Sequence, residues 1–465
     1  MNEQEKHKFE IHPTVSKVLR ITALVLILLT IYLTANMAIT FCLGLFAKGN
    51  RVVRLPWQES PIVMLQSEKT KKPVIAPGEE VLVARTEILV TGDILLHMPI
   101  VRSAWTGDGY DFDDVFAYVE PYVTSAGYAS ATLETTLSGI GKTFSGFPNF
   151  NSPDEIAQGT KNAGFDLLVT ATEHCYDFGT EGLLRTLSTV QKTGLSASGT
   201  VEAAEEPRHS IHTSNDVRIG IASYTYSDLR EDGSVGLNGL NAEADAAALV
   251  NTFDPKRLSR FYTEIEGELA AMRSGGADIT VLYLHWGDEY SMAVSDTQRS
   301  MAQKLCDLGV DIIVGSHPHV VQPIDLLTSS NNPDHKTLVI YSAGTLLSNL
   351  RAESSDLPSG HTEDGFLFRI TLAKYNDDST RIAAVSLIPT WVVVHGSGEE
   401  RDFCILPLNQ QVSDWEAAYG LSPSQLSSAK NSYNRTMAIV TAGLNKITSY
   451  LAEQKGKLDP NFGVG

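Results

Sequence analysis

Short runs of β-branched and other apolar residues alternate with amphipathic stretches from Thr86 to about residue 407, and this alternation constrains the fold more than any other feature of the chain. Apolar runs of this length are typical of buried strands, and the stretches between them have helical periodicity. Glycines such as Gly164 and Gly309 stand just after expected helices, where they commonly end a helix. The pattern predicts an α/β fold built from successive βα units.

Acidic residues and histidines stand where several of the expected strands end. In α/β sheets ligands bind outside the carboxyl ends of the strands, so polar side chains from distant stretches can converge there. Mixed carboxylate and imidazole ligands suit borderline divalent ions such as Zn, Mn, Fe or Co. The sequence therefore predicts a metal site. The strand-end residues are Asp93, Glu134, His174, His285, His317 and His319.

Two local motifs sharpen this prediction. In GSHPH, His317 and His319 flank a proline; residues two apart in an extended segment face the same side, so both imidazoles are expected to point at one site. Gly92 precedes Asp93, and a residue without a side chain would let the backbone approach a ligand closely.

The TEHCYDFG stretch carries a second functional pair. Asp177 follows His174 by three residues. It either hydrogen-bonds the second imidazole nitrogen or caps the helix that follows, and the sequence leaves both interpretations open.

The segment from Ile21 to Ala47 contains no charged residue. It exceeds the ~20 residues that a helix needs to cross a bilayer. A cleaved signal peptide is the competing interpretation, but the apolar run is long and has no clear A-x-A site. We therefore expect a cytoplasmic tail at 1–20 and an uncleaved single-pass anchor at 21–47 in the cell membrane, with the large C-terminal part extracytoplasmic.

The rest of the chain divides by composition. Spaced prolines predict an extracytoplasmic stalk at 48–84. The βα pattern fills a domain at 85–408, and a polar helical pattern predicts a C-terminal helical extension at 409–465. The net charge of -19 argues against a nucleic-acid partner, because phosphate backbones require a basic surface.

Six motifs together resemble the CapA/PgsA family of capsule and poly-γ-glutamate synthesis proteins, over about 87–407: TGDILLH, ATLETTLSG, TATEHCYDFGTEGL, LHWGDEY, GVDIIVGSHPHVVQ and IYSAGTLLS. The resemblance implies a calcineurin-like fold, a four-layer α/β/β/α sandwich of the metallo-dependent phosphatase type. It also implies a membrane-anchored extracytoplasmic protein, with capsule or poly-γ-glutamate synthase subunits as partners. The ligand candidates that it implies are Asp93, Glu134, His174, His285, His317 and His319.

The chain departs from the family pattern at three motifs. Thr132-Leu133-Glu134 stands for the usual Asn-Leu-Glu, and Gly344-Thr345-Leu346 for Gly-Asn-Phe. Thr172-Glu173-His174 stands for Asn-Asn-His, whose second asparagine is a metal ligand in related phosphoesterases. Glu173 either replaces that amide as a charged ligand or marks a site that has lost its metal.

Three functional hypotheses follow. The first is a metal-dependent hydrolase, in which one or two Mn, Fe or Zn ions activate water against a phosphoester or an amide, and His174, paired with Asp177, transfers a proton to the leaving group. The second is a non-catalytic assembly or polymer-binding component of a capsule synthase complex. The third is a degenerate domain kept as a surface interaction module.

Overall fold

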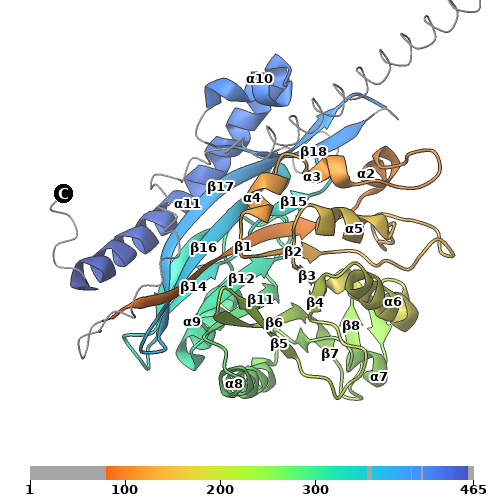
Figure 1. Cartoon of the computed structure of the whole chain (residues 1–465). Coiled ribbons are helices and arrows are strands. Elements are labelled where there is room, and N and C mark those ends of the chain that lie inside the picture. The colour runs from red at the N-terminus through yellow and green to blue at the C-terminus, as the bar shows by residue number, and fades with distance from the viewer. Residues whose placement is uncertain (1–79, 353–358, 399–400, 410–411, 459–465) are drawn as a thin grey trace, which may run out of the picture. The chain divides into compact units, whose positions relative to one another are not determined.

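Two β-sheets face each other and enclose the largest part of the hydrophobic core (Figure 1). The computed structural model describes residues 80–352, 359–398, 401–409 and 412–458. The expected tail at 1–20, the anchor at 21–47 and the stalk up to residue 79 lie outside these ranges. Within them, no helix combines the length and the apolar character that a membrane span needs.

The first sheet has a parallel half and an antiparallel half. Its order is β18-β17-β16-β1-β2-β3-β4, with β15 paired to β1. Strands β1 to β4 are parallel, whereas β16, β17 and β18 run antiparallel to their neighbours. The strands are β1 (Leu82–Ile94), β2 (Tyr128–Leu133), β3 (Leu167–Val169), β4 (Ser196–Ser198), β15 (Thr345–Leu347), β16 (Asp364–Tyr375), β17 (Thr380–His395) and β18 (Asp402–Pro407).

The second sheet has the order β10-β6-β11-β12-β14-β13, with β5 paired to β6. Its strands β10, β6, β11, β12 and β14 are parallel, and β5 and β13 are antiparallel to theirs. The strands are β5 (His209–Ser214), β6 (Val217–Tyr226), β10 (Thr252–Phe253), β11 (Ile279–His285), β12 (Ile312–Ser316), β13 (Ile324–Thr328) and β14 (Lys336–Ile340).

Side chains along each strand point alternately into the space between the two sheets and toward the outer faces. Val90 of β1 pairs with Phe368 of β16, and both pack against β11 residues such as Tyr283 between the sheets. Because successive side chains of a strand point to opposite faces, Leu89 and Leu282 point outward, yet both are buried. Helices therefore cover both outer faces, and the fold is mixed α/β, as predicted.

The covering helices come mostly from the connections between strands. On the second sheet, α8 and α9 pack against the outward side chains of β11, β12 and β14. On the first, α6 contacts β4, and α2 and α3 contact β18. The helices up to residue 308 are α2 (Met98–Ser103), α3 (Asp113–Phe116), α4 (Glu120–Thr124), α5 (Glu155–Asn162), the 3-10 helix η1 (Glu173–Tyr176), α6 (Gly179–Lys192), α7 (Ala244–Ala247), α8 (Leu258–Ser274) and α9 (Asp296–Leu308).

The 3-10 helix η2 (His361–Glu363) precedes β16, and the region after β18 is helical, with η3 (Val412–Asp414), α10 (Trp415–Tyr419) and the long α11 (Pro423–Leu458). Helix α11 packs along β17 and β13 and places Val440 and Ile447 in the core between the sheets. Its Arg435 forms a bidentate ion pair with the buried Asp364, with both nitrogen–oxygen distances at 2.7 Å. The segment expected as a C-terminal extension thus contributes to the main core.

Candidate metal centre

The strand-end residues predicted to converge do so at the edge where the carboxyl ends of both sheets meet. Asp93 lies near the end of β1, Glu134 follows β2, and Glu173 begins η1 shortly after β3. His285 ends β11, and the HPH segment follows β12. The first sheet therefore supplies the carboxylates and the second sheet supplies the imidazoles.

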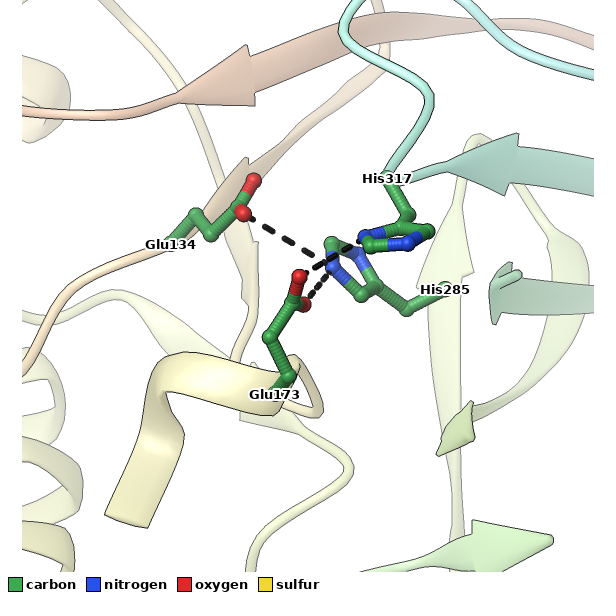
Figure 2. Close-up of side chains that lie close together, drawn as sticks. All are labelled: Glu134, Glu173, His285 and His317. Atoms are coloured by element: carbon green, nitrogen blue, oxygen red, sulfur yellow. Dashed lines mark ion pairs between the residues drawn. The ribbon is translucent and has the colours of Figure 1, made fainter. Parts of the chain in front are cut away.

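Four of these side chains form one donor group (Figure 2). Glu134, Glu173, His285 and His317 each offer a ligand atom within 4.8 Å of the others, and all four are buried. Nδ1 of His317 lies 2.7 Å from Oε1 of Glu173, and Nε2 of His285 contacts the other oxygen of Glu173. Glu173 thus contacts both histidines of the group, and Glu134 faces the same two rings (Figure 2).

A second donor group shares one residue with the first. It consists of Asp93, Glu134 and His319. Nδ1 of His319 lies 3.3 Å from Oδ2 of Asp93, and its Nε2 lies 3.5 Å from Oε1 of Glu134. Glu134 therefore belongs to both groups.

The chemistry of these atoms fits a divalent cation. Three buried carboxylate oxygens of the two donor groups have no hydrogen-bond partner among the described residues: both oxygens of Glu134 and Oδ1 of Asp93. A buried carboxylate without a partner is costly, and a cation is one of the few groups that could satisfy all these atoms together. Carboxylate and imidazole donors suit borderline metals such as Mn, Fe and Zn.

The electrostatics of the two glutamates also favour a cation at this centre. Burial, together with the charges of Glu173 and Asp93, raises the pKa of Glu134 well above its usual range. Burial opposes ionisation of Glu173 as well, but His285 and His317 hold the pKa of Glu173 well below its usual range. A bound cation would relieve the repulsion that now acts on Glu134.

The HPH segment has a different backbone from the one predicted. His317 and His319 have positive φ angles of 94° and 55°, so the segment is not extended as expected. Non-glycine residues are uncommon in this region, and holding them there carries strain that the surrounding structure must support. The backbone N–H of His317 donates to Oδ2 of Asp93 at 3.3 Å, which ties the turn to β1. Both rings still reach the centre.

Gly92 has a structural role that the sequence did not predict. A side chain at this position would collide with the carbonyl oxygen of Gly344, whose own φ is 69°. The next residue, Asp93, donates its backbone N–H to that carbonyl at 3.1 Å. Gly92 therefore lets β1 approach the Gly344 backbone, and this contact fixes the position of the Asp93 carboxylate.

His285 is oriented by a residue that sequence reasoning missed. Its Nδ1 lies 2.8 Å from Oγ of Ser316, the last residue of β12, so its Nε2 is directed to the donor group. Burial lowers the pKa of His285, which favours the neutral imidazole that a metal requires. Ser316 stands in the GSHPH motif, but only the parallel pairing of His285 with Ser316 brings the two together.

His174 lies beside the centre and is not part of either donor group. Its Nδ1 is 2.8 Å from Oδ2 of Asp177, and that oxygen also accepts the backbone N–H of Phe150 at 2.7 Å. Asp177 makes no side-chain cap to α6, whose N-cap is Phe178, so of the two interpretations the imidazole contact is the observed one. Asn238 donates to Oδ1 of Asp177 at 2.7 Å and was not foreseen.

An open cleft gives access to the centre. One pocket of about 730 Å³ is lined by Glu173, His317 and Tyr226, and a neighbouring pocket of about 440 Å³ is lined by His97 and His319. The two pockets share three lining residues, which are Phe147, His174 and Glu289. Their sizes are in the range of small-molecule sites.

These features define an α/β protein with a candidate divalent-metal centre at the base of a cleft. The family model described as bacterial capsule synthesis protein PGA_cap matches residues 87–350, which is more than half of the chain. The chain belongs to this family of bacterial capsule synthesis proteins. Membership confirms the predicted resemblance.

Two individual relatives are each less than 30% identical to the chain. The chain is 25% identical over 349 residues to the capsule biosynthesis protein CapA of Bacillus anthracis, covering 67% of this chain and 78% of that protein. It is 27% identical over 237 residues to the PGA biosynthesis protein CapA of Bacillus subtilis strain 168, covering 50% of this chain and 57% of that protein.

A solved structure of the Thermus thermophilus sulfate thiohydrolase SoxB in complex with glycerol matches with a TM-score of 0.35 and 13% identity. The match covers 74% of this chain and 47% of that one. Its TM-score is too low to carry an argument.

Proposed function

We propose that this protein acts in the synthesis or export of a capsule or poly-γ-glutamate polymer, as a membrane-anchored, extracytoplasmic, metal-dependent hydrolase of a phosphoester. The observation that carries the proposal is the convergence of buried donor atoms without hydrogen-bond partners at the base of an open cleft. The names of the relatives support the capsule theme. The uncharged run at 21–47 supports the anchor, and the facing sheets support a fold of the metallo-dependent phosphatase type.

The donor residues would hold one or two ions. When bound, a divalent ion supplies Lewis acidity, lowers the pKa of water and neutralises charge on a phosphoester. The carboxylates and imidazoles that would hold it are Asp93, Glu134, Glu173, His285, His317 and His319.

His174 is the proposed proton donor to the leaving group, with Asp177 as its positioning residue. Because Nδ1 contacts Asp177, Nε2 is the nitrogen that can exchange a proton in the cleft, which His174 lines. Burial lowers the pKa of His174, but its contact with Asp177 and the charge of Glu173 outweigh this effect and raise it. A raised pKa favours the protonated form that a general acid needs.

The test is hydrolysis of bis(p-nitrophenyl) phosphate by the purified full-length chain, loaded in turn with Mn²⁺, Fe²⁺ and Zn²⁺. We expect measurable turnover that falls to background in His317→Ala and persists in the control His395→Ala, at the last residue of β17 and outside the linings of both pockets of the cleft. Inactivity of the metal-loaded protein on a broad panel of phosphoesters would contradict the proposal.

One observation favours a second candidate, a non-catalytic assembly or polymer-binding component. Glu173 contacts both His285 and His317, so the two imidazoles of the first donor group already have a polar partner without a metal ion. In this case the chain would co-purify with a capsule or poly-γ-glutamate synthase membrane subunit. That association would be unchanged in His317→Ala, and no phosphoester would be hydrolysed.

A further inference from the structure

A separate pocket of about 320 Å³ adjoins the cleft of the metal centre. The two share Ser227 and Asp254 in their linings. The pocket lies between the end of β6, β10, α7 and the first turns of α8, next to the small sheet of β7 (Asp228–Leu229), β8 (Val235–Leu237) and β9 (Leu240–Ala242).

Three arginines line this pocket, although the chain as a whole carries a net charge of -19. Arg257 is paired with the buried Asp254, at 2.7 Å. Arg208 donates to neutral acceptors, the carbonyl oxygen of Ala248 at 2.6 Å and Oδ1 of Asn251 at 3.3 Å. Its guanidinium therefore has hydrogen bonds but no ion pair with any described residue.

Arg260 is the more available cation. It is exposed in the first turn of α8 and has no ion pair or hydrogen bond with the residues that the structure describes. The pocket also contains Glu264, which accepts a hydrogen bond from the hydroxyl of Tyr224 at 3.1 Å. Arg208 and Arg260 thus have no carboxylate within ion-pair distance among the described residues.

The remaining lining is largely apolar. It includes Leu229, Val235, Val250, Phe253 and Phe261. A guanidinium binds a carboxylate through a planar pair of N–H groups, and apolar walls favour a ligand with an aliphatic part. The volume is at the small end of the ~300–1,000 Å³ typical of ligand sites.

We propose that this pocket binds a carboxylate carried on a short aliphatic chain, with Arg260 and Arg208 as its cationic contacts. Because the pocket adjoins the cleft, a polymer with carboxylate side groups that lies over the metal centre would place one side group here. This extension to a polymer rests on the proposed function, whereas the carboxylate site itself does not.

The test is isothermal titration calorimetry of the full-length chain with glutarate, a five-carbon dicarboxylate. The protein is kept in chelator, so that a metal at the donor groups cannot bind the probe. We expect saturable binding that is at least tenfold weaker in Arg260→Glu. The matched control is Arg299→Glu, at an exposed arginine of α9 outside the lining of this pocket, and it should bind as the unaltered chain does.

Three results would overturn the site: no saturable binding, equal affinity in Arg260→Glu, or Arg260-dependent binding of inorganic phosphate in place of glutarate. Failure here is distinct from failure of the proposed function, because metal content and phosphoester hydrolysis are measured separately in the same variants.

A γ-linked glutamate trimer distinguishes a polymer side group from a free small carboxylate as the ligand of this pocket. Tighter binding of the trimer than of glutarate, lost in Arg260→Glu, would support a polymer ligand. Binding of glutarate alone would support the site but overturn the polymer extension.

Discussion

The carboxylate of Glu134 lies 3.5 Å from Nε2 of His319, and neither of its oxygens has a hydrogen-bond partner among the described residues. The oxygen near His319 is Oε1 of Glu134, and it also lies 3.8 Å from Nε2 of His285, in the other donor group. One buried side chain therefore connects the residues of both groups. The surroundings of Glu134 disfavour its ionised form, and a bound cation would favour that form.

Glu134→Gln is expected to have opposite effects on metal binding and on stability. The neutral amide removes the one carboxylate shared by both groups, so metal affinity should fall by more than tenfold. In chelator, the free energy of unfolding should rise by about 1–3 kcal/mol at neutral pH, because folding no longer buries an acid whose pKa is raised well above its usual range. Metal titration and urea unfolding measure the two effects. A loss of stability in chelator would contradict the account.

Ser316→Ala tests the orientation of His285. Without the Oγ contact at 2.8 Å, the imidazole loses the partner that directs its Nε2 to the centre. Loss of such a partner typically costs about 10–100-fold in metal affinity. Competition with a calibrated chelator measures this, with Ser329→Ala, a buried serine just after β13, as the control. Equal affinities in the two variants would show that Ser316 has no orienting role.

Asp177→Asn tests the proton-transfer role of His174. The amide cannot accept from Nδ1 as a charged oxygen does, so kcat should fall by about 10²–10⁴-fold while metal content stays unchanged. Because Asp177 raises the pKa of His174, its loss should lower that pKa. A general acid loses activity as pH rises through its pKa, so the alkaline limb of the rate profile should move to lower pH. The control is Asp296→Asn, at the exposed first residue of α9 and outside the linings of both pockets of the cleft; a matching profile in both variants would exclude the role.

Arg435→Met tests the attachment of α11. Removing the arginine leaves the Asp364 carboxylate buried without its bidentate partner, a change that typically costs about 3–5 kcal/mol. Burial raises the pKa of Asp364 to about 6 despite Arg435, which lowers it. A carboxyl whose pKa is raised in the folded state loses stabilisation as pH rises through that pKa.

The deficit of Arg435→Met should therefore be smaller at about pH 5 than at about pH 8, because the unpaired acid is protonated at the lower pH. Urea unfolding at the two pH values measures the deficit. The double variant Asp364→Asn, Arg435→Met should regain part of the stability at the higher pH. A deficit independent of pH would show that Asp364 is not the group responsible.

Local pattern made part of this structure predictable. The apolar runs that end at Glu134 and His285 are strands, and the polar residues after them lie at the carboxyl ends because parallel strands share one direction. The same reasoning brought Asp93, His317 and His319 to that edge. Their roles as metal ligands remain a prediction.

Other features depend on contacts between distant parts of the chain, which single-sequence patterns do not carry. The division of carboxylates and imidazoles between two facing sheets is one, and the position of Glu173 between His285 and His317 is another. Asn238 comes from the turn of the β8–β9 hairpin, marked by an Asn-Gly pair, but nothing local links that turn to Asp177. The φ of His317 depends on its contact with Asp93.

The most direct test of the central claim is elemental analysis of the purified full-length chain beside its Asp93→Ala, His317→Ala double variant, which alters one residue in each donor group. The account predicts near-stoichiometric Mn, Fe or Zn in the unaltered chain and background metal in the variant. Equal metal content in both proteins, or none in either after reconstitution, would contradict it.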